Sequence, residues 1–159
     1  MSVILTIHLG ERDSTYSAEG QQYVVPVGAH TLTAMLTTDP PRPEDLTNAI
    51  GLLVDHIADD VAREVSAAIL ADVVQLSGPG VATVVAVEVG GEAVVPFTLS
   101  REAAEEVFRT LVTEALPDRV RNPGLPANEA TSVLGVCCAV VAVLRALQLR
   151  ELTVVQEQH

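Results

Sequence analysis

The sequence predicts a single α/β domain, spanning residues 1–159, in which helices cover a mixed sheet. Near the start, three short strand-like segments are separated by tight turns, which is typical of an antiparallel meander. Amphipathic helical segments then alternate with short apolar segments, which indicates parallel strands joined by helices. With 159 residues and 48% hydrophobic residues, the chain is long and apolar enough to bury one full core.

The meander is predicted from strand composition and turn residues. Residues 2–9 are rich in Val, Ile and Leu and form the first predicted strand. Ser14–Ala18 is a second, weaker strand, and Gln22–Val27 is a third. Glu19 and Gly20 supply the turn between the last two strands, so these three segments should pair in sequence order.

Four helical segments are predicted after the meander. Pro43, Glu44 and Asp45 suit a first helical turn, where proline is tolerated and acids meet the positive end of the helix. An apolar stripe follows at helical spacing, formed by Leu46, Ile50, Leu53, Val54, Ile57 and Val61. The predicted ranges are His30–Leu36, Pro43 to about Val65, Arg101–Leu116 with Ser100 as N-cap, and a last helix from Asn128 or Thr131 to about Leu149.

Asp72–Leu76 and Leu152–Val155 are predicted as further strands. Val81–Val87 fits two structures, because its valines favour a strand and its place after a glycine turn favours a helix. Residues 116–126 contain three prolines and are predicted as a loop. This order of elements is that of a ribonuclease-H-like domain, the unit repeated in actin-like ATPases.

Composition excludes several classes of function. The formal net charge is −12, all nine bases are arginines, and they form no basic run, so we expect no nucleic-acid binding. The longest apolar run, Val133 to Leu144, is shorter than the ~20 residues that span a bilayer, and the start has no secretion signal. We therefore expect a cytoplasmic protein without a membrane partner, with Cys137 and Cys138 as small buried residues.

Four stretches, in order, carry a resemblance to a known family. They are "VILTIHLGERDST" (3–15), "VPVGAHTLTAMLTTDPP" (25–41), "VVQLSGPGVAT" (73–83), and "TLSREAAEEVFRTL" (98–111) followed by "DRVRNPGLPANEATSVLGVCCAVVAVL" (118–144). Together they resemble the second actin-like domain of the exopolyphosphatase and guanosine-pentaphosphate phosphatase (Ppx/GppA) family. The resemblance covers nearly the whole chain, and members of that family cleave phosphoanhydrides in a cleft between two such domains.

The resemblance implies phosphate-binding positions in two turns. These positions are Gly10, Ser14, Thr15, Gly78, Gly80 and Thr83. From the residues alone, the first turn also fits a plain hairpin in which Asp13 and Ser14 bond to local backbone. The second turn likewise fits a simple strand-to-helix connection, and Pro79 removes one amide donor from it. Both interpretations stay open at each turn.

The departures from the family pattern bear on activity. His8 stands where the family has Asp, and Glu11 and Arg12 replace glycines whose backbone amides approach phosphate. The Arg-Ala-Asp at the start of the family's last long helix falls on residues 129–131, which are Glu-Ala-Thr here. The first domain of the family, which supplies the catalytic Glu, has no counterpart in these residues.

These observations favour a catalytically inactive, stand-alone interaction or regulatory module over an enzyme. Its expected partner is a second copy of the chain or a full-length relative. The alternative is a phosphoanhydride hydrolase, or a phosphate- or nucleotide-binding domain, whose site a partner chain completes and whose phosphate ligand would bring Mg²⁺. We assign no catalytic residue and no metal site, because His56 and its neighbouring aspartates fit a solvated helix face better than a metal centre.

Overall fold

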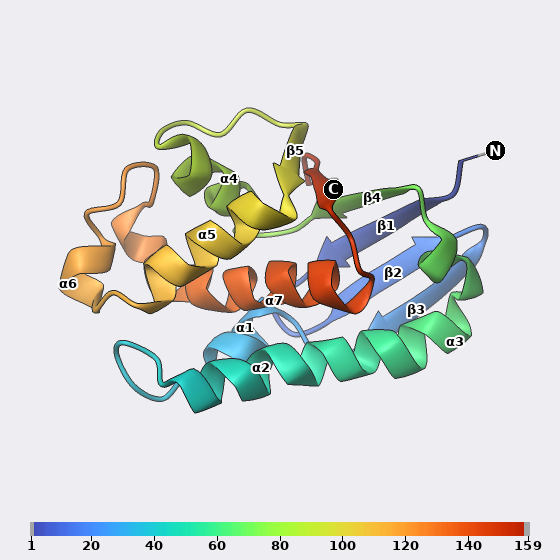
Figure 1. Cartoon of the computed structure of the whole chain (residues 1–159), viewed down its shortest axis with the longest axis horizontal. Coiled ribbons are helices and arrows are strands. Elements are labelled where there is room, and N and C mark those ends of the chain that lie inside the picture. The colour runs from blue at the N-terminus through green and yellow to red at the C-terminus, as the bar shows by residue number, and fades with distance from the viewer. Residues whose placement is uncertain (1, 158–159) are drawn as a thin grey trace.

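The computed structural model describes residues 2–157 and contains a six-stranded mixed sheet in the order β3-β2-β1-β4-β6-β5 (Figure 1). β1, β4 and β6 run parallel, whereas β2, β3 and β5 pair antiparallel with their neighbours. The predicted meander and mixed-sheet fold class are confirmed. The strands are β1 Ile4–Leu9, β2 Ser14–Ala18, β3 Gln21–Val25, β4 Val73–Ser77, β5 Phe97–Ser100 and β6 Glu151–Val154.

The four predicted helical regions are all helical. The long second one is a continuous run whose middle is a π-helical turn at Ile57–Val61. Short 3₁₀ turns lie at Ser66–Leu70 and Ala127–Glu129. The α-helices are α1 Ala29–Thr33, α2 Pro43–His56, α3 Ala62–Glu64, α4 Val81–Val89, α5 Arg101–Val112, α6 Leu116–Arg119 and α7 Ser132–Ala146.

Three segments differ from the sequence prediction or resolve it. The ambiguous valine-rich segment is the helix α4, which glycines with positive φ bracket at both ends, Gly80 at +84° and Gly90 at +72°. The predicted loop at 116–126 contains the short helix α6. The edge strand β5 was not predicted, because it is too short to give a clear pattern and its partner β6 lies far along the chain.

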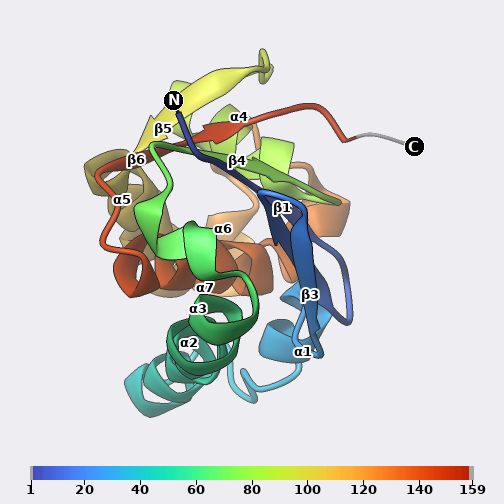
Figure 2. The ribbon, with the colours of Figure 1, turned by 90° about the vertical axis from the view of Figure 1, so that its right-hand side faces the viewer.

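The larger helices, α2, α5 and α7, lie on one face of the sheet (Figure 2). Along β1, Leu5, Ile7 and Leu9 are buried toward these helices, whereas the residues between them face the other way. In α7 every residue from 133 to 144 is buried, since α1, α2 and α5 all pack around it. The helix α7 is apolar on all sides and therefore forms the centre of the core. Within residues 2–157, no helix has both the length and the hydropathy that crossing a membrane requires.

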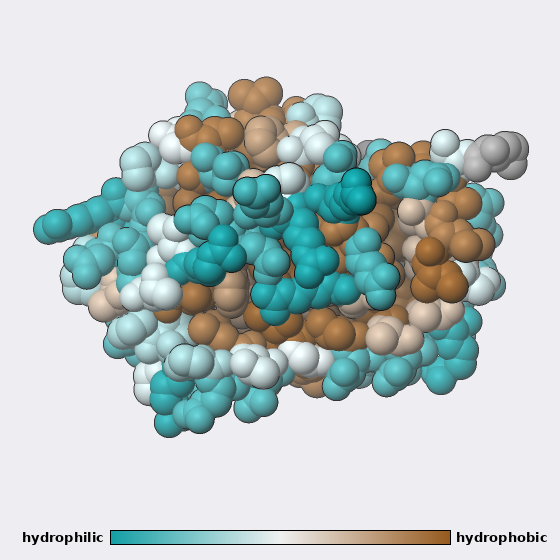
Figure 3. Space-filling view, viewed as in Figure 1, coloured by the Kyte–Doolittle hydropathy of each residue, from teal (hydrophilic) through white to brown (hydrophobic). Residues whose placement is uncertain are grey.

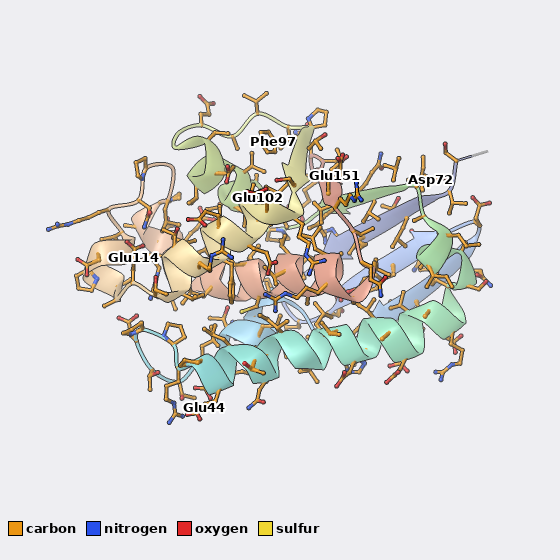
Figure 4. All side chains as sticks on the ribbon, in the orientation of Figure 1. Glu44, Asp72, Phe97, Glu102, Glu114 and Glu151 are labelled. Carbon is orange, nitrogen blue, oxygen red and sulfur yellow. The ribbon has the colours of Figure 1, made fainter. Side chains whose placement is uncertain are left out.

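Charged and polar side chains fix the helix ends. Glu44 lies at the start of α2 and Glu102 in the first turn of α5, where a carboxylate stabilises the positive helix end (Figure 4). The Ser100 hydroxyl accepts a hydrogen bond from the Ala103 amide at 3.0 Å, which confirms the predicted N-cap.

On the helix side, an apolar band separates the polar surface of α5 from α2 (Figure 3). This band includes a groove lined by Leu46, Ile50, Val54 and Phe108.

A buried arginine ties the end of α5 to distant segments. Arg119 is 1% exposed. Its guanidinium donates to the carbonyl oxygens of Leu111 and Ala130, each at 3.0 Å, and of Glu114 at 2.7 Å. It also donates to Oδ1 of Asp39 at 2.6 Å, and the other oxygen of Asp39 accepts from the Leu116 amide at 2.8 Å. One side chain thus joins α5, α6, the segment before α7 and the loop before α2.

Asp39 makes the stability of this junction depend on pH. The hydrogen bond from the Leu116 amide, together with the bond and charge of Arg119, lowers the pKa of Asp39 below its ordinary value of 3.8. A lowered pKa means that the stabilisation is present above about pH 4 and is lost as the pH falls through the pKa of the folded state. At pH 7, we expect Asp39→Asn to lower the free energy of unfolding by about 1 kcal/mol, because water screens the half-exposed carboxylate.

Urea unfolding of both proteins between about pH 5 and about pH 2 measures this effect. The gap between wild type and Asp39→Asn should close toward the acid end, because protonation makes Asp39 as uncharged as the asparagine that replaces it. A gap that stays constant over this range would show that the carboxylate charge does not stabilise the junction. Asp72→Asn, at an aspartate that accepts from the Val3 amide, is the control for a carboxylate without an arginine partner.

Candidate functional site

The two glycine-bearing turns meet at the carboxyl ends of adjacent parallel strands. Gly10 directly follows β1, and Gly78 directly follows β4. Gly78 has a φ of +139°, and a Cβ there would collide with the backbone of Leu9. Only glycine allows the two turns to lie this close. The two turns that the resemblance singles out therefore lie side by side in the structure.

A pocket of about 230 Å³ lies between these turns and the start of α7, and we call it the turn pocket. Glu11 comes from the first turn and Gly80 from the second, while His30 and Thr33 come from α1. Glu129 and Ser132 close it from the segment that leads into α7. Among the described residues that line it, two carry carboxylates and none is an arginine, so the turn pocket disfavours a polyanion.

In the first turn, carbonyl oxygens rather than amides do most of the bonding to other segments. The Gly10 amide donates to the Asp13 carbonyl at 2.9 Å, which closes the hairpin. The Gly10 carbonyl accepts from the Ala29 amide at 3.0 Å, and the Glu11 carbonyl accepts from the His30 amide at 2.7 Å. The carbonyl oxygens of the turn therefore accept the hydrogen bonds of the first amides of α1. Without the turn, these amides could donate to a phosphate.

Ser14 and Thr15 point away from the turn pocket. The Ser14 side chain is fully buried, donates to the Val27 carbonyl at 2.9 Å and bonds to the Tyr16 hydroxyl at 3.0 Å. Burial raises the pKa of Tyr16 to about 12, although the hydrogen bond between Tyr16 and Ser14 acts against the rise. Thr15 is half-buried and alternates with these residues, so it lies on the opposite face of the sheet. Their predicted phosphate contacts have no support in this geometry.

The second turn leads into α4 and already holds an anion. Gly80 is the N-cap of α4, and the Thr83 amide donates to its carbonyl at 3.1 Å. The Thr83 hydroxyl donates to Oε1 of Glu129 at 2.6 Å. A carboxylate thus lies at the first turn of α4, where the positive end of the helix stabilises negative charge. A phosphate at this helix end would lie close to the Glu129 carboxylate, and two negative charges repel each other.

The structure therefore divides the six predicted positions. Gly80 and Thr83 adjoin the turn pocket. Gly78 lies against the backbone of Leu9, whereas Gly10 bonds within its own hairpin and to the Ala29 amide of α1. Ser14 and Thr15 face elsewhere. Glu129 is the residue of the turn pocket whose contact with Thr83 the sequence analysis did not predict. It was visible only as the loss of an expected arginine, because its contact with Thr83 spans 46 residues.

Other candidate chemistry is accounted for by local structure. Nδ1 of His56 lies 2.9 Å from Asp60 on the same helical run. Within residues 2–157, no three His, Cys, Asp or Glu side chains gather closely enough to hold a metal ion. Cys137 and Cys138 are free and buried in α7, and burial raises the pKa of Cys138 to about 12. Neither thiol is poised as a nucleophile.

The sheet order and its helical layer define this chain as an α/β domain of the actin-like ATPase fold. The Aquifex aeolicus Ppx/GppA phosphatase superposes with a TM-score of 0.80 and 18% identity, over 98% of this chain and 53% of that protein. An exopolyphosphatase-like protein gives 0.85 and 19%, over 98% and 55%. An exopolyphosphatase from Cytophaga hutchinsonii gives 0.72 and 15%, over 98% and 53%.

The chain thus has the fold of a single domain of Ppx/GppA proteins and spans about half the length of these structures. The expected resemblance is confirmed at the level of the fold. At the level of sequence, no family model and no curated protein matches the chain.

Proposed function

We propose that this chain is an interaction or regulatory domain with a Ppx/GppA-like fold that does not hydrolyse phosphoanhydrides by itself. The observation that carries the proposal is the bond from Thr83 to Glu129 at 2.6 Å. It puts a protein carboxylate at the end of α4 that a phosphate would otherwise use. A polyphosphate entering the turn pocket would have to displace this carboxylate and lie beside Glu11 as well.

Two further features support the proposal. The first amides of α1 are already bonded to the Gly10 and Glu11 carbonyls, so they offer no free donors to an anion. The whole chain carries a formal charge of −12, which opposes the approach of polyanions at low salt. Hydrolysis of a phosphoanhydride depends on stabilising charge on the transferring phosphoryl oxygens, so the two carboxylates and the lack of an arginine among the described lining residues support the proposal.

The proposal predicts two negative results with the purified chain. Phosphate release from polyphosphate or guanosine pentaphosphate with Mg²⁺ should stay at the level of the protein-free blank. Pyrophosphate at about 10 mM should leave the melting temperature unchanged. A site that bound it with a dissociation constant of ~0.1 mM would instead raise the free energy of unfolding by about 2.7 kcal/mol. Phosphate release that scales with the amount of wild-type protein would contradict the proposal.

Glu129→Gln separates the carboxylate from the rest of the pocket. The amide keeps the size of the side chain but removes its charge, so this variant tests whether Glu129 alone excludes phosphate. If pyrophosphate raised the melting temperature of the variant but not that of the wild type, Glu129 would be the residue that keeps phosphate out of the turn pocket. Glu88→Gln, at an exposed position on α4, is the matched control and should behave as wild type.

The second candidate is a phosphate-binding or hydrolase domain whose site another chain completes. It is favoured by one observation: the turns after β1 and β4 line one pocket, as a shared phosphate site would require. Since the described residues hold no metal-ligating cluster, Mg²⁺ would have to enter with the phosphate. This candidate predicts a specific activity that rises with protein concentration, or that appears when a full-length relative is added.

A further inference from the structure

The face of the sheet opposite the helices carries no helix of the described part of this chain (Figure 2). Parallel strands such as β1, β4 and β6 are normally covered on both faces, so a bare face on them is unusual. We call this surface the open sheet face. Its exposed and half-exposed strand residues are Ile4, Thr6, His8, Thr15, Ser17, Gln22, Val24, Val73, Gln75, Thr98, Ser100, Glu151 and Thr153, and the outward Ser77 beside His8 is buried.

The strand register places one uncharged polar residue of each strand in a single row. Thr6 lies at the centre, paired with Ser17 on one side and Gln75 on the other. Further pairings extend the row to the edge strands. The complete row is Gln22, Ser17, Thr6, Gln75, Thr153 and Thr98. Each of these side chains can both donate and accept hydrogen bonds.

Charge is confined to the margin of this face. Ile4 pairs with Val73 beside the row, and Val24 pairs with Thr15 on its other side, so apolar residues flank it. Among the described strand residues of the open sheet face, Glu151 is the one acid, and it lies at the start of β6. His8, close to Glu157 at 4.0 Å, lies at the carboxyl ends of the strands. A charge-depleted centre with a polar margin is the composition of protein interfaces.

We propose that the open sheet face binds the same face of a second copy of this chain, sheet against sheet. A two-fold interface must be complementary to itself, and a row of Thr, Ser and Gln side chains meets this condition. Two chains of charge −12 repel each other, so they associate best through a surface whose centre holds no carboxylate. The short Thr and Ser side chains also suit packing of two sheets about 10 Å apart.

The size of the face is consistent with a dimer. Six strands about 4.8 Å apart and about five residues long present roughly 500 Å². Two copies stacked on this face would bury roughly 1,000 Å² in total, which is at the lower limit for a specific interface. We therefore expect a dimer that dissociates at low protein concentration. The partner of the proposed interaction domain would then be a second copy of the chain, bound through the open sheet face, which rests on the interaction role proposed above.

Sedimentation velocity of the wild-type chain over a range of concentrations tests the inference, with Thr6→Arg and Gln22→Arg as variants. Each substitution puts a like charge into the interface twice, so the dissociation constant should rise at least about tenfold. Asn48→Arg, at an exposed position of α2 on the helix side, changes the net charge equally and should dimerise as wild type does. Circular dichroism of each variant checks that it is folded.

Salt gives an independent measurement. Because the two acidic chains repel and the interface centre is uncharged, raising NaCl from about 50 to about 500 mM should strengthen the dimer, whereas salt weakens an interface built on ion pairs. A wild-type chain that stays monomeric, or a dimer that survives both face variants, would overturn the inference. The dimerisation experiments use no phosphate ligand, so they are independent of the hydrolysis assay. A chain that is monomeric and releases no phosphate would contradict the proposed dimer interface but would agree with the proposed absence of hydrolysis.

Discussion

Replacing Arg119 with methionine is expected to lower the free energy of unfolding by about 3–5 kcal/mol. Methionine fills a similar space but donates no hydrogen bond. The substitution leaves the carbonyl oxygens of Leu111, Glu114 and Ala130 without their donor, and it leaves Asp39 without its cation. Leu111 and Glu114 lie at the carboxyl end of α5, where helix carbonyls lack partners within the helix and a cation is favourable.

Urea unfolding followed by circular dichroism measures this loss. Arg121→Met is the matched control, because Arg121 is exposed two residues further on and its replacement should change stability by less than about 0.5 kcal/mol. Arg119→Lys should fall between the two, since an ammonium keeps the charge but cannot reach all four acceptors as a planar fork does. A loss below about 1 kcal/mol in Arg119→Met would show that water replaces the guanidinium bonds.

The contrast between Arg119 and Arg121 shows what the sequence could predict. Local pattern identified the apolar stripe of α2 and the capping of α5, because both depend on residues within one or two turns. Arg119 stands in a proline-rich stretch that reads as an exposed loop. Its burial depends on Asp39, which is 80 residues away in the chain. No periodicity in the sequence encodes such a contact.

The candidate site divides in the same way. The positions of Gly10 and Gly78 after two strands were predictable, because strand ends and glycine turns are local features. The sequence analysis assigned Ser14 to the first turn, whereas alternation along β2 places it with Tyr16 in the core. The contact of Glu129 with Thr83 was not predictable, since it depends on how the segment before α7 packs on α4. The site therefore required the structure, whereas most of the fold did not.

Replacing Gly135 with alanine is expected to destabilise the protein by about 3 kcal/mol, the second-largest effect. Gly135 is buried in the first turn of α7, where this helix crosses α1. A Cβ at this position would collide with the Ala29 carbonyl and the Thr33 hydroxyl of α1. Thr33 itself donates to the Ala29 carbonyl at 3.0 Å, so the obstructing atoms are held in place. The two helices would have to separate, which loses packing in the centre of the core.

Gly51→Ala in α2 is the control that separates collision from helix propensity. A Cβ on Gly51 would meet nothing within 4 Å, so alanine there should stabilise the protein by about 1 kcal/mol through its higher helix propensity. Opposite signs for the same chemical change at two helical glycines would show that contact with α1 decides the result at Gly135. If Gly135→Ala also stabilised the protein, α1 would have to shift freely, and the turn that caps α1 would shift with it. The closeness of α1 and α7 therefore also holds the wall of the turn pocket that carries His30 and Thr33.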